Sequence, residues 1–169
     1  MPSPIGHALT GVAIGHLCGR QALSRRDAWW LTLCGVVAIA PDLDILWGHH
    51  RTWTHSLGAT LAACVIAAVV ASLRRLPVGA TALAIGLAFG SHVFLDWLGR
   101  DSRDPRGVMA FWPISSAYYV SDLDVFTEIS RRYWLPEQFI VGNLKSIARE
   151  IILLAPIVWL AWRFRRPHS

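Results

Sequence analysis

The sequence predicts an all-α, multi-pass membrane protein with four or five membrane-embedded segments. Hydrophobic residues make up 54% of its 169 residues and charged residues only 16%, whereas soluble domains average about 25% charged residues. The apolar residues gather in long runs, and none of these runs shows the alternation typical of a β-strand. The length suits one domain covering residues 1–169.

Five apolar runs are the candidate helices, and a bilayer crossing needs about 20 such residues. The runs are 5–19, 28–47, 52–73, 76–95 and 151–162. The third has 22 residues and the fourth 20, both free of Asp, Glu, Lys and Arg, so both can span. The second nearly qualifies, while the first and last are short enough to be tilted, re-entrant or interfacial. A polar insert at about 99–149 is expected to form loops with one or two short helices.

Arginine clusters mark one end of the predicted bundle. If the runs alternate in direction, three clusters share a side: Arg20, Arg25 and Arg26; Arg74 and Arg75; Arg163, Arg165 and Arg166. The positive-inside rule then places this side in the cytoplasm and the opposite side on the outer face. The insert adds seven basic residues to that outer side, so the counts nearly balance. No nucleic-acid motif is present, and we expect no direct nucleic-acid binding.

Residues that suit a metal ion gather at the other end of the runs. They are His7, Asp42, Asp44, His50, His55, His92 and Asp96. His92 and Asp96 are four residues apart and share one helix face. This pair can hold one divalent cation, Asp96 can instead orient His92, or the two can satisfy each other as a polar pair inside the bundle.

The motif PDLD places Asp42 and Asp44 two residues apart, which on an α-helix directs them to nearly opposite sides. Both can serve one site if the helix ends or unwinds near Pro41, or if one bridges metal ions while the other supports the ligands. The alternative is a helix-capping aspartate with a solvated neighbour.

The motif HHRTWTHS contributes His50 and His55 as expected ligands, with His49 as a spare histidine. Ser56 or Thr54 is expected to cap the helix that follows. The planar guanidinium of Arg51 suits a phosphate or carboxylate, and the alternative is a surface arginine facing lipid headgroups.

The donor set favours Zn²⁺, with Mn²⁺ or Fe²⁺ as alternatives, because it combines imidazoles and carboxylates without thiolates. Four histidines and three aspartates exceed the needs of one structural site. The surplus favours a catalytic site with one or two ions, where a metal-activated water becomes a nucleophile.

The ordered motifs PIGHALTG, PDLD, HRTWTHS, SHVFLD and FWPIS, over residues 4–116, resemble those of the LexA-binding, inner-membrane-associated, YdjM-like metal-dependent hydrolases. The resemblance implies a multi-pass bacterial inner-membrane protein, a hydrolase site at the seven residues above and a regulatory protein partner. The order of ligands is also similar, more distantly, to zinc-dependent phospholipase C and P1 nuclease. Those enzymes carry a later His-x-x-x-Glu pair, and this chain has no histidine between His92 and His168.

Three functions fit these features. The favoured one is hydrolysis of an ester or phosphodiester, with a phospholipid as the expected substrate. In this function Asp42 or Asp44 bridges metals or accepts a proton, His50 is a ligand or acid, and Arg51 binds an anionic substrate. The main alternative is a non-enzymatic membrane scaffold with a structural metal. A metal-ion transporter ranks last, because its ligands would be spread through the bilayer.

Overall fold

The computed structural model describes residues 1–18, 25–48 and 50–164, except the side chains of residues 25–27. The helices are α1 (Pro4–Cys18), α2 (Arg25–Ile39) with a 3₁₀ continuation (Ala40–Trp47), α3 (Leu57–Leu73), α4 (Val78–Leu98), and a π-helical turn (Glu137–Gly142) that leads into α5 (Asn143–Arg163). No β-strand occurs among the described residues. The all-α prediction is confirmed.

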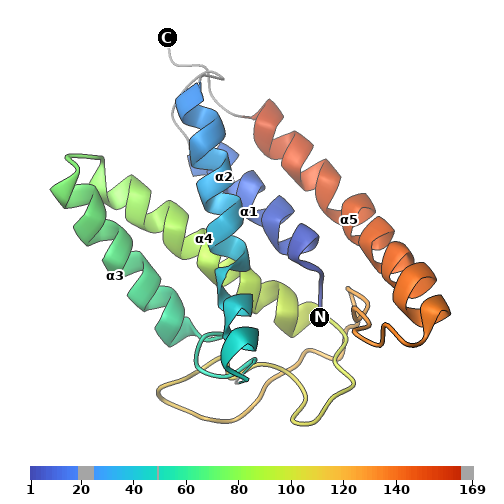
Figure 1. Cartoon of the computed structure of the whole chain (residues 1–169). Helices are drawn as coiled ribbons and strands as arrows, with labels where there is room; N and C mark the ends of the chain where they lie inside the picture. The colour runs from blue at the N-terminus through green and yellow to red at the C-terminus, as the bar shows by residue number, and fades with distance from the viewer. Residues whose placement is uncertain (19–24, 49, 165–169) are drawn as a thin grey trace.

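Helix α1 lies at the centre of the bundle. It packs against α2, α4 and α5, while α3 packs against α4; Figure 1 shows α3 and α5 on opposite flanks. The approach of α1 to α2 depends on Gly11. A Cβ atom at Gly11 would lie 2.3 Å from the carbonyl oxygen of Cys34 and 2.8 Å from the Cβ of Ala38. Only a residue without a side chain fits between these helices.

We expect Gly11→Ala to destabilise the protein by about 1–3 kcal/mol, because the added methyl group forces the backbone of α2 to move. Gly79→Ala is the matched control: a Cβ there meets nothing within 4 Å, so stability should be unchanged or slightly higher. Thermal unfolding of the detergent-purified variants measures both effects. Equal midpoints for the two variants would show that α2 has room to move at no cost.

Two of the described helical segments are long and apolar enough to cross a membrane: Ala28–Trp47, with 20 residues, and Val78–Leu98, with 21. This is fewer than the four or five segments predicted. The third run falls short because the chain turns before Leu57, where the Ser56 hydroxyl accepts a hydrogen bond from the N–H of Ala59 and caps α3. Helix α3 therefore has 17 residues. The prediction of a cap at Ser56 or Thr54 is confirmed for Ser56.

Large apolar side chains point outward from the bundle. On α3, Leu61 is 65% exposed and Ile66 64%, and on α5 Ile152 is 72% exposed. Water-soluble proteins rarely expose contiguous apolar surface of this kind. The outside of these helices therefore suits hydrocarbon better than water.

The irregular segment is shorter than the predicted insert, since it covers 99–136 and residues 143–149 already belong to α5. The inward face of α5 begins with Ser146, Glu150 and Leu154, which are buried at four-residue intervals. A helix packs against its neighbours through side chains three or four positions apart. On this part of α5 two of those buried side chains are polar. The apolar run in the sequence therefore predicts a helix start at 151, about two turns after the observed start of α5 at Asn143.

The two ends of the bundle differ in character, as predicted. In Figure 1 the turn between α3 and α4, which carries Arg74 and Arg75, lies at the same end as the start of α2 and the end of α5. The 3₁₀ segment and the insert lie at the other end. Arg20, Arg165 and Arg166 fall outside the described residues.

Candidate metal centre

Four elements bring polar side chains together at the insert end of the bundle. These are the first turn of α1, the 3₁₀ segment, the loop before α3 and the last turns of α4. The residues are His7, Asp42, Asp44, His50, His55, His92 and Asp96, the seven that the sequence singled out. His49 lies outside the described residues.

The 3₁₀ segment explains how two aspartates so close in sequence serve one cluster. Helix α2 tightens at Ala40, immediately before Pro41. Residues two apart then point about 120° apart instead of nearly opposite. Asp42 faces the Nε2 atoms of His55 and His92, whereas Asp44 faces the Nδ1 atoms of His50 and His55. The condition that the α-helix ends near Pro41 is met, since α2 ends at Ile39.

The deepest part of the cluster is formed by His55, His92 and Asp96. His55 and His92 are fully buried and Asp96 is 1% exposed. The two Nε2 atoms are 3.1 Å apart, and they lie 3.4 Å (His55) and 3.3 Å (His92) from Asp96 Oδ2. Neither oxygen of Asp96 has a hydrogen-bond partner within the described part of the chain. Several donor atoms thus converge on a small buried space.

Both imidazoles of this group are oriented through their other nitrogen. His92 Nδ1 lies 2.7 Å from the carbonyl oxygen of Ala38, which can only accept a hydrogen bond. His55 Nδ1 lies 3.1 Å from Asp44 Oδ2. If Nδ1 carries the proton in each ring, the Nε2 lone pairs face the centre of the group, which is the arrangement of a metal-binding histidine.

His7 and Asp42 complete the cluster: His7 is buried in its interior, whereas Asp42 is partly exposed. The ring of His7 stacks on that of His92, with centroids 3.7 Å apart, and its Nε2 lies 3.4 Å from Asp96 Oδ1. Asp42 Oδ1 lies 3.7 Å from the Nε2 atoms of both His55 and His92. Three groups could each hold a cation: His7–Asp42–His92, Asp42–His50–His55 and His55–His92–Asp96. Asp42 belongs to two of them.

Asp44 supports the other residues and belongs to none of these groups. Its carboxylate lies 2.8 Å from His50 Nδ1, accepts a hydrogen bond from the Thr54 hydroxyl at 2.5 Å, and accepts one from the backbone N–H of Arg51 at 3.2 Å. Asp44 therefore organises the loop that carries His50 and His55.

The pKa of His55 shows which charge the cluster favours. Burial alone would lower the pKa of this imidazole, but the carboxylates of Asp42 and Asp44 outweigh burial and raise it to about 9. Three carboxylates around four imidazoles thus favour an added positive charge, which a proton or a metal ion can supply.

We expect metal binding to compete with this proton. A ligand imidazole must be deprotonated, so below pH 9 the ion has to displace the proton on His55, and the affinity should fall as the pH drops. Near pH 7 about one proton should be released for each ion bound by His55. Calorimetric titrations in buffers of different ionisation enthalpy count the released protons. Metal binding that releases none would place His55 outside the ligand set.

Arg51 has a structural partner that the sequence did not indicate. Its guanidinium donates a hydrogen bond to the carboxylate of Asp101, a residue of the insert that is 4% exposed. Asp101 also accepts hydrogen bonds from the backbone N–H groups of Arg103 and Gly107, at 3.2 and 2.7 Å. Arg51 therefore joins the loop that carries His50 and His55 to the insert.

A pocket of about 340 Å³ opens beside the cluster, between the start of the chain, the 3₁₀ segment and the insert. Its polar lining is formed by Asp42, His50, Arg51, Asp101, Arg103, Glu128 and Arg131. Arg131, which the sequence analysis did not single out, places its NH2 atom 3.3 Å from His50 Nε2. The cluster is accessible from this side through Asp42 and His50.

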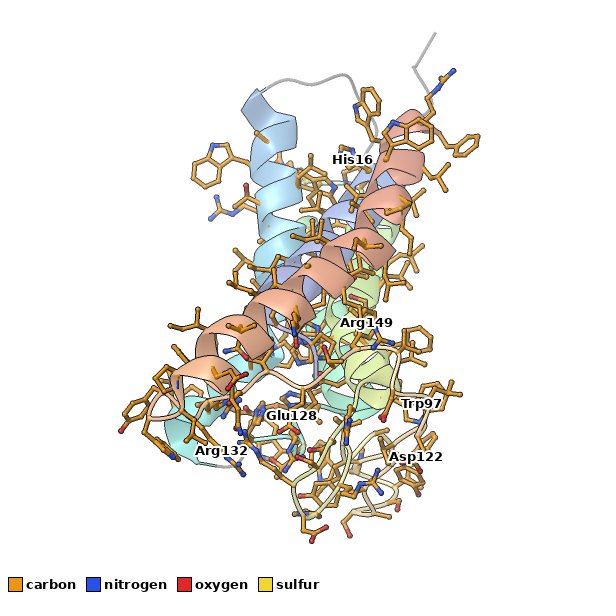
Figure 2. The ribbon with its side chains drawn as sticks, turned by 90° about the vertical axis from the view of Figure 1, so that its right-hand side faces the viewer. His16, Trp97, Asp122, Glu128, Arg132 and Arg149 are labelled. Carbon is orange, nitrogen blue, oxygen red and sulfur yellow. The ribbon has the colours of Figure 1, made fainter. Side chains whose placement is uncertain are left out.

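The other acids and histidines that the structure describes belong to none of the three groups. Asp122 pairs with Arg106 at 2.6 Å and Glu128 with Arg103 at 3.2 Å, so each is part of an ion pair in the insert. His16 lies at the arginine end of the bundle, far from the insert in Figure 2. His168 falls outside the described residues.

A family model described as YdjM inner membrane protein matches residues 1–167. No curated protein and no solved structure matches the chain. The match covers all the residues of the cluster, the insert and α5. The match does not show that the chain binds LexA. It also does not show the more distant similarity to phospholipase C and P1 nuclease.

Proposed function

The chain belongs to the YdjM inner membrane protein family. We propose that it is a membrane-bound, metal-dependent hydrolase of ester or phosphodiester bonds. The observation that supports it most is the Asp96 carboxylate. It is buried, neither oxygen has a hydrogen-bond partner among the described residues, and Nε2 atoms of three histidines lie within 3.4 Å. A buried carboxylate is costly unless a cation compensates it.

The proposed ligands are His7, His55, His92 and Asp96, with Asp42 shared between neighbouring groups. Imidazole and carboxylate donors favour Zn²⁺, with Mn²⁺ or Fe²⁺ as alternatives, and the overlapping groups leave room for one or two ions. The chemistry that such an ion supplies is activation of a water molecule and polarisation of the bond to be cleaved.

His50 is better placed to transfer a proton than to bind metal. Asp44 Oδ1 lies 2.8 Å from its Nδ1, which fixes the ring and leaves Nε2 facing the pocket. With Nδ1 held by Asp44, His50 presents Nε2 to a substrate in the pocket, where it is in position to exchange a proton with a leaving group. Asp42, 18% exposed and 3.7 Å from two Nε2 atoms, is the better candidate to bridge metals or accept a proton from water.

The same proposal includes a multi-pass topology with the site at the outer face of the inner membrane. Two segments qualify as spans by length and composition, and the apolar outer faces of α3 and α5 favour further embedded helices. The described arginines at the helix ends, Arg74, Arg75 and Arg163, lie opposite the cluster. The positive-inside rule favours the cytoplasm for that end.

A lipid is the proposed substrate, because apolar side chains surround the site end. Trp47 is 69% exposed, Trp53 54% and Ile114 94%, and tryptophan favours the interface between headgroups and hydrocarbon. The pocket would then open at headgroup level. Turnover of detergent-dispersed phospholipid should exceed that of bis(4-nitrophenyl) phosphate, a soluble phosphodiester. Equal turnover, or turnover of the soluble ester alone, would remove the lipid from the proposal.

A second candidate is a membrane scaffold with a structural metal that binds a regulatory protein. The observation in its favour is that His55, His92 and Asp96 are at most 1% exposed, as in closed structural sites. The pocket beside Asp42 and His50 favours the hydrolase. Bound metal without turnover of any ester in a substrate screen would favour the scaffold. A metal-ion transporter fits less well, because the donors gather at one end of the bundle.

A further inference from the structure

Arg131 differs from the other arginines that line the pocket beside the cluster. Arg51 is hydrogen-bonded to the Asp101 carboxylate, and Arg103 lies 3.2 Å from Glu128. For Arg131 the structure gives no carboxylate partner within the described ranges; its guanidinium instead faces the Nε2 atom of His50 at 3.3 Å. Among the described residues that line the pocket, Arg131 is therefore the arginine without a carboxylate partner.

The backbone beside Arg131 is fixed, although its side chain is exposed. The N–H of Ser130 donates to Asn143 Oδ1 at 2.8 Å, and Asn143 Nδ2 donates to the Ser130 carbonyl oxygen at 2.9 Å. Asn143 is the first residue of α5. Two hydrogen bonds thus attach the insert to a helix at the residue before Arg131, and this attachment directs the insert toward the cluster.

We propose that Arg131 and His50 form a phosphoryl-binding subsite at the mouth of the candidate metal centre. The inference rests on the proposed function and narrows it: the bond cleaved is a phosphate ester and not a neutral carboxylic ester. A guanidinium offers two parallel N–H donors that match the oxygens of a phosphate. His50 Nε2 faces the same space, and the pocket has room for a headgroup. This assigns to Arg131 the role that the sequence suggested for Arg51.

The subsite also explains how the insert contributes to the centre. The metal-binding residues come from α1, α4 and the residues between α2 and α3, whereas Arg131 comes from the segment just before α5. Contact between Arg131 and His50 joins residues 81 positions apart. A phosphoryl group bound between Arg131 and His50 would contact both the insert and the loop that carries His50 and His55.

Binding of inorganic phosphate tests the subsite independently of turnover. The full chain, purified in detergent and loaded with Zn²⁺, is titrated with phosphate in a calorimeter. We expect Arg131→Gln to weaken binding by about tenfold or more, since a charge-assisted hydrogen bond is lost. Arg132→Gln is the matched control, as it removes the same charge from the adjacent residue, which does not line the pocket. It should bind phosphate as the wild type does.

Two further variants test whether phosphate affinity depends on the guanidinium group of Arg131, on its charge alone, or on its position. Arg131→Lys keeps the charge without the planar fork and should bind with intermediate affinity. Asn143→Ala leaves Arg131 intact but removes both bonds to Ser130, and we expect it to weaken binding several-fold. Zinc content should be the same in all variants. Equal weakening by Arg131→Gln and Arg132→Gln, or no binding to wild type, would overturn the proposal.

The source of the phosphoryl group is tested with vesicles. Phosphatidylcholine vesicles with and without phosphatidic acid are compared with inorganic phosphate. Sensitivity to Arg131→Gln with phosphatidic acid alone would assign the subsite to a lipid headgroup, and sensitivity with both probes to phosphate esters in general. Arg131-dependent phosphate binding without hydrolysis of any ester would refute the hydrolase and keep the subsite. Hydrolysis that is unaffected by Arg131→Gln would keep the hydrolase and refute the subsite.

Discussion

Asp96→Asn is expected to abolish metal binding by the buried group of His55, His92 and Asp96. The amide has the shape of the carboxylate but lacks its charge, so the imidazoles lose the anion that compensates a divalent ion. Outer-shell substitutions already cost about 10- to 100-fold in affinity or activity, and loss of a ligand should exceed the upper figure. Elemental analysis of the detergent-purified protein, followed by turnover of a phosphodiester, measures both losses.

The same substitution has a second consequence that separates a metal centre from a polar packing network. Without metal, the wild type buries a carboxylate whose oxygens have no hydrogen-bond partner among the described residues. A neutral amide at this position costs less to bury. Above pH 9, where His55 carries no compensating proton, metal-free Asp96→Asn should therefore be at least as stable as the metal-free wild type. If Asp96 held the bundle together as a packing residue, the variant would be less stable with or without metal.

Asp122→Asn is the matched control for this experiment. Asp122 belongs to the insert, its side chain is 65% exposed, and its partner is Arg106; Figure 2 shows it at the outer part of the insert. An exposed ion pair contributes little to stability. Metal content and turnover should match the wild type. Retention of metal by Asp96→Asn would contradict the assignment of Asp96 as a ligand, on which both the hydrolase and the scaffold proposals depend.

The grouping of the His and Asp side chains could be predicted from the sequence because helical geometry fixes most of the distances within it. His92 and Asp96 are one turn apart on α4, so their proximity follows from spacing alone. The alternation of helices in direction then brings His7 and the loop before α3 to the same end. Family membership over residues 1–167 confirms the YdjM-like resemblance that these motifs suggested. Their roles as ligands stay predictions.

The residues contributed by the insert could not be predicted in the same way. Its path depends on backbone hydrogen bonds between distant segments, such as the N–H of Leu57 to the carbonyl of Ala110 at 2.8 Å. Such bonds leave no periodic pattern in the sequence. Asp101 and Arg131 therefore looked like ordinary loop residues. An aspartate in a polar loop gives no sign that it will be buried against an arginine 50 positions earlier.

Glu150 was missed for a different reason, since it lies on a helix but on its polar first half. It is fully buried on α5. Its Oε1 atom accepts a hydrogen bond from the backbone N–H of Ser3 at 2.7 Å, and its Oε2 atom accepts one from the Ser3 hydroxyl. Ser3 in turn precedes α1, and its carbonyl accepts a hydrogen bond from the N–H of His7 at 3.2 Å. Glu150 thus fixes the start of the helix that carries His7.

We therefore expect Glu150→Ala to lower the free energy of unfolding by about 3 kcal/mol, because it leaves the buried N–H of Ser3 without an acceptor and opens a cavity. Metal affinity should fall by about 10- to 100-fold as His7 loses its fixed position. Glu150→Gln is the control. Its amide can still accept a hydrogen bond from the N–H of Ser3 and can donate one to the hydroxyl, so the free energy of unfolding and the metal affinity should stay near wild type.

Thermal unfolding and metal titration of the two variants measure these effects. Equal losses in both variants would mean that the charge of Glu150 matters and not its hydrogen bonds, whereas a destabilised Glu150→Ala with normal metal affinity would show that His7 does not depend on this anchor.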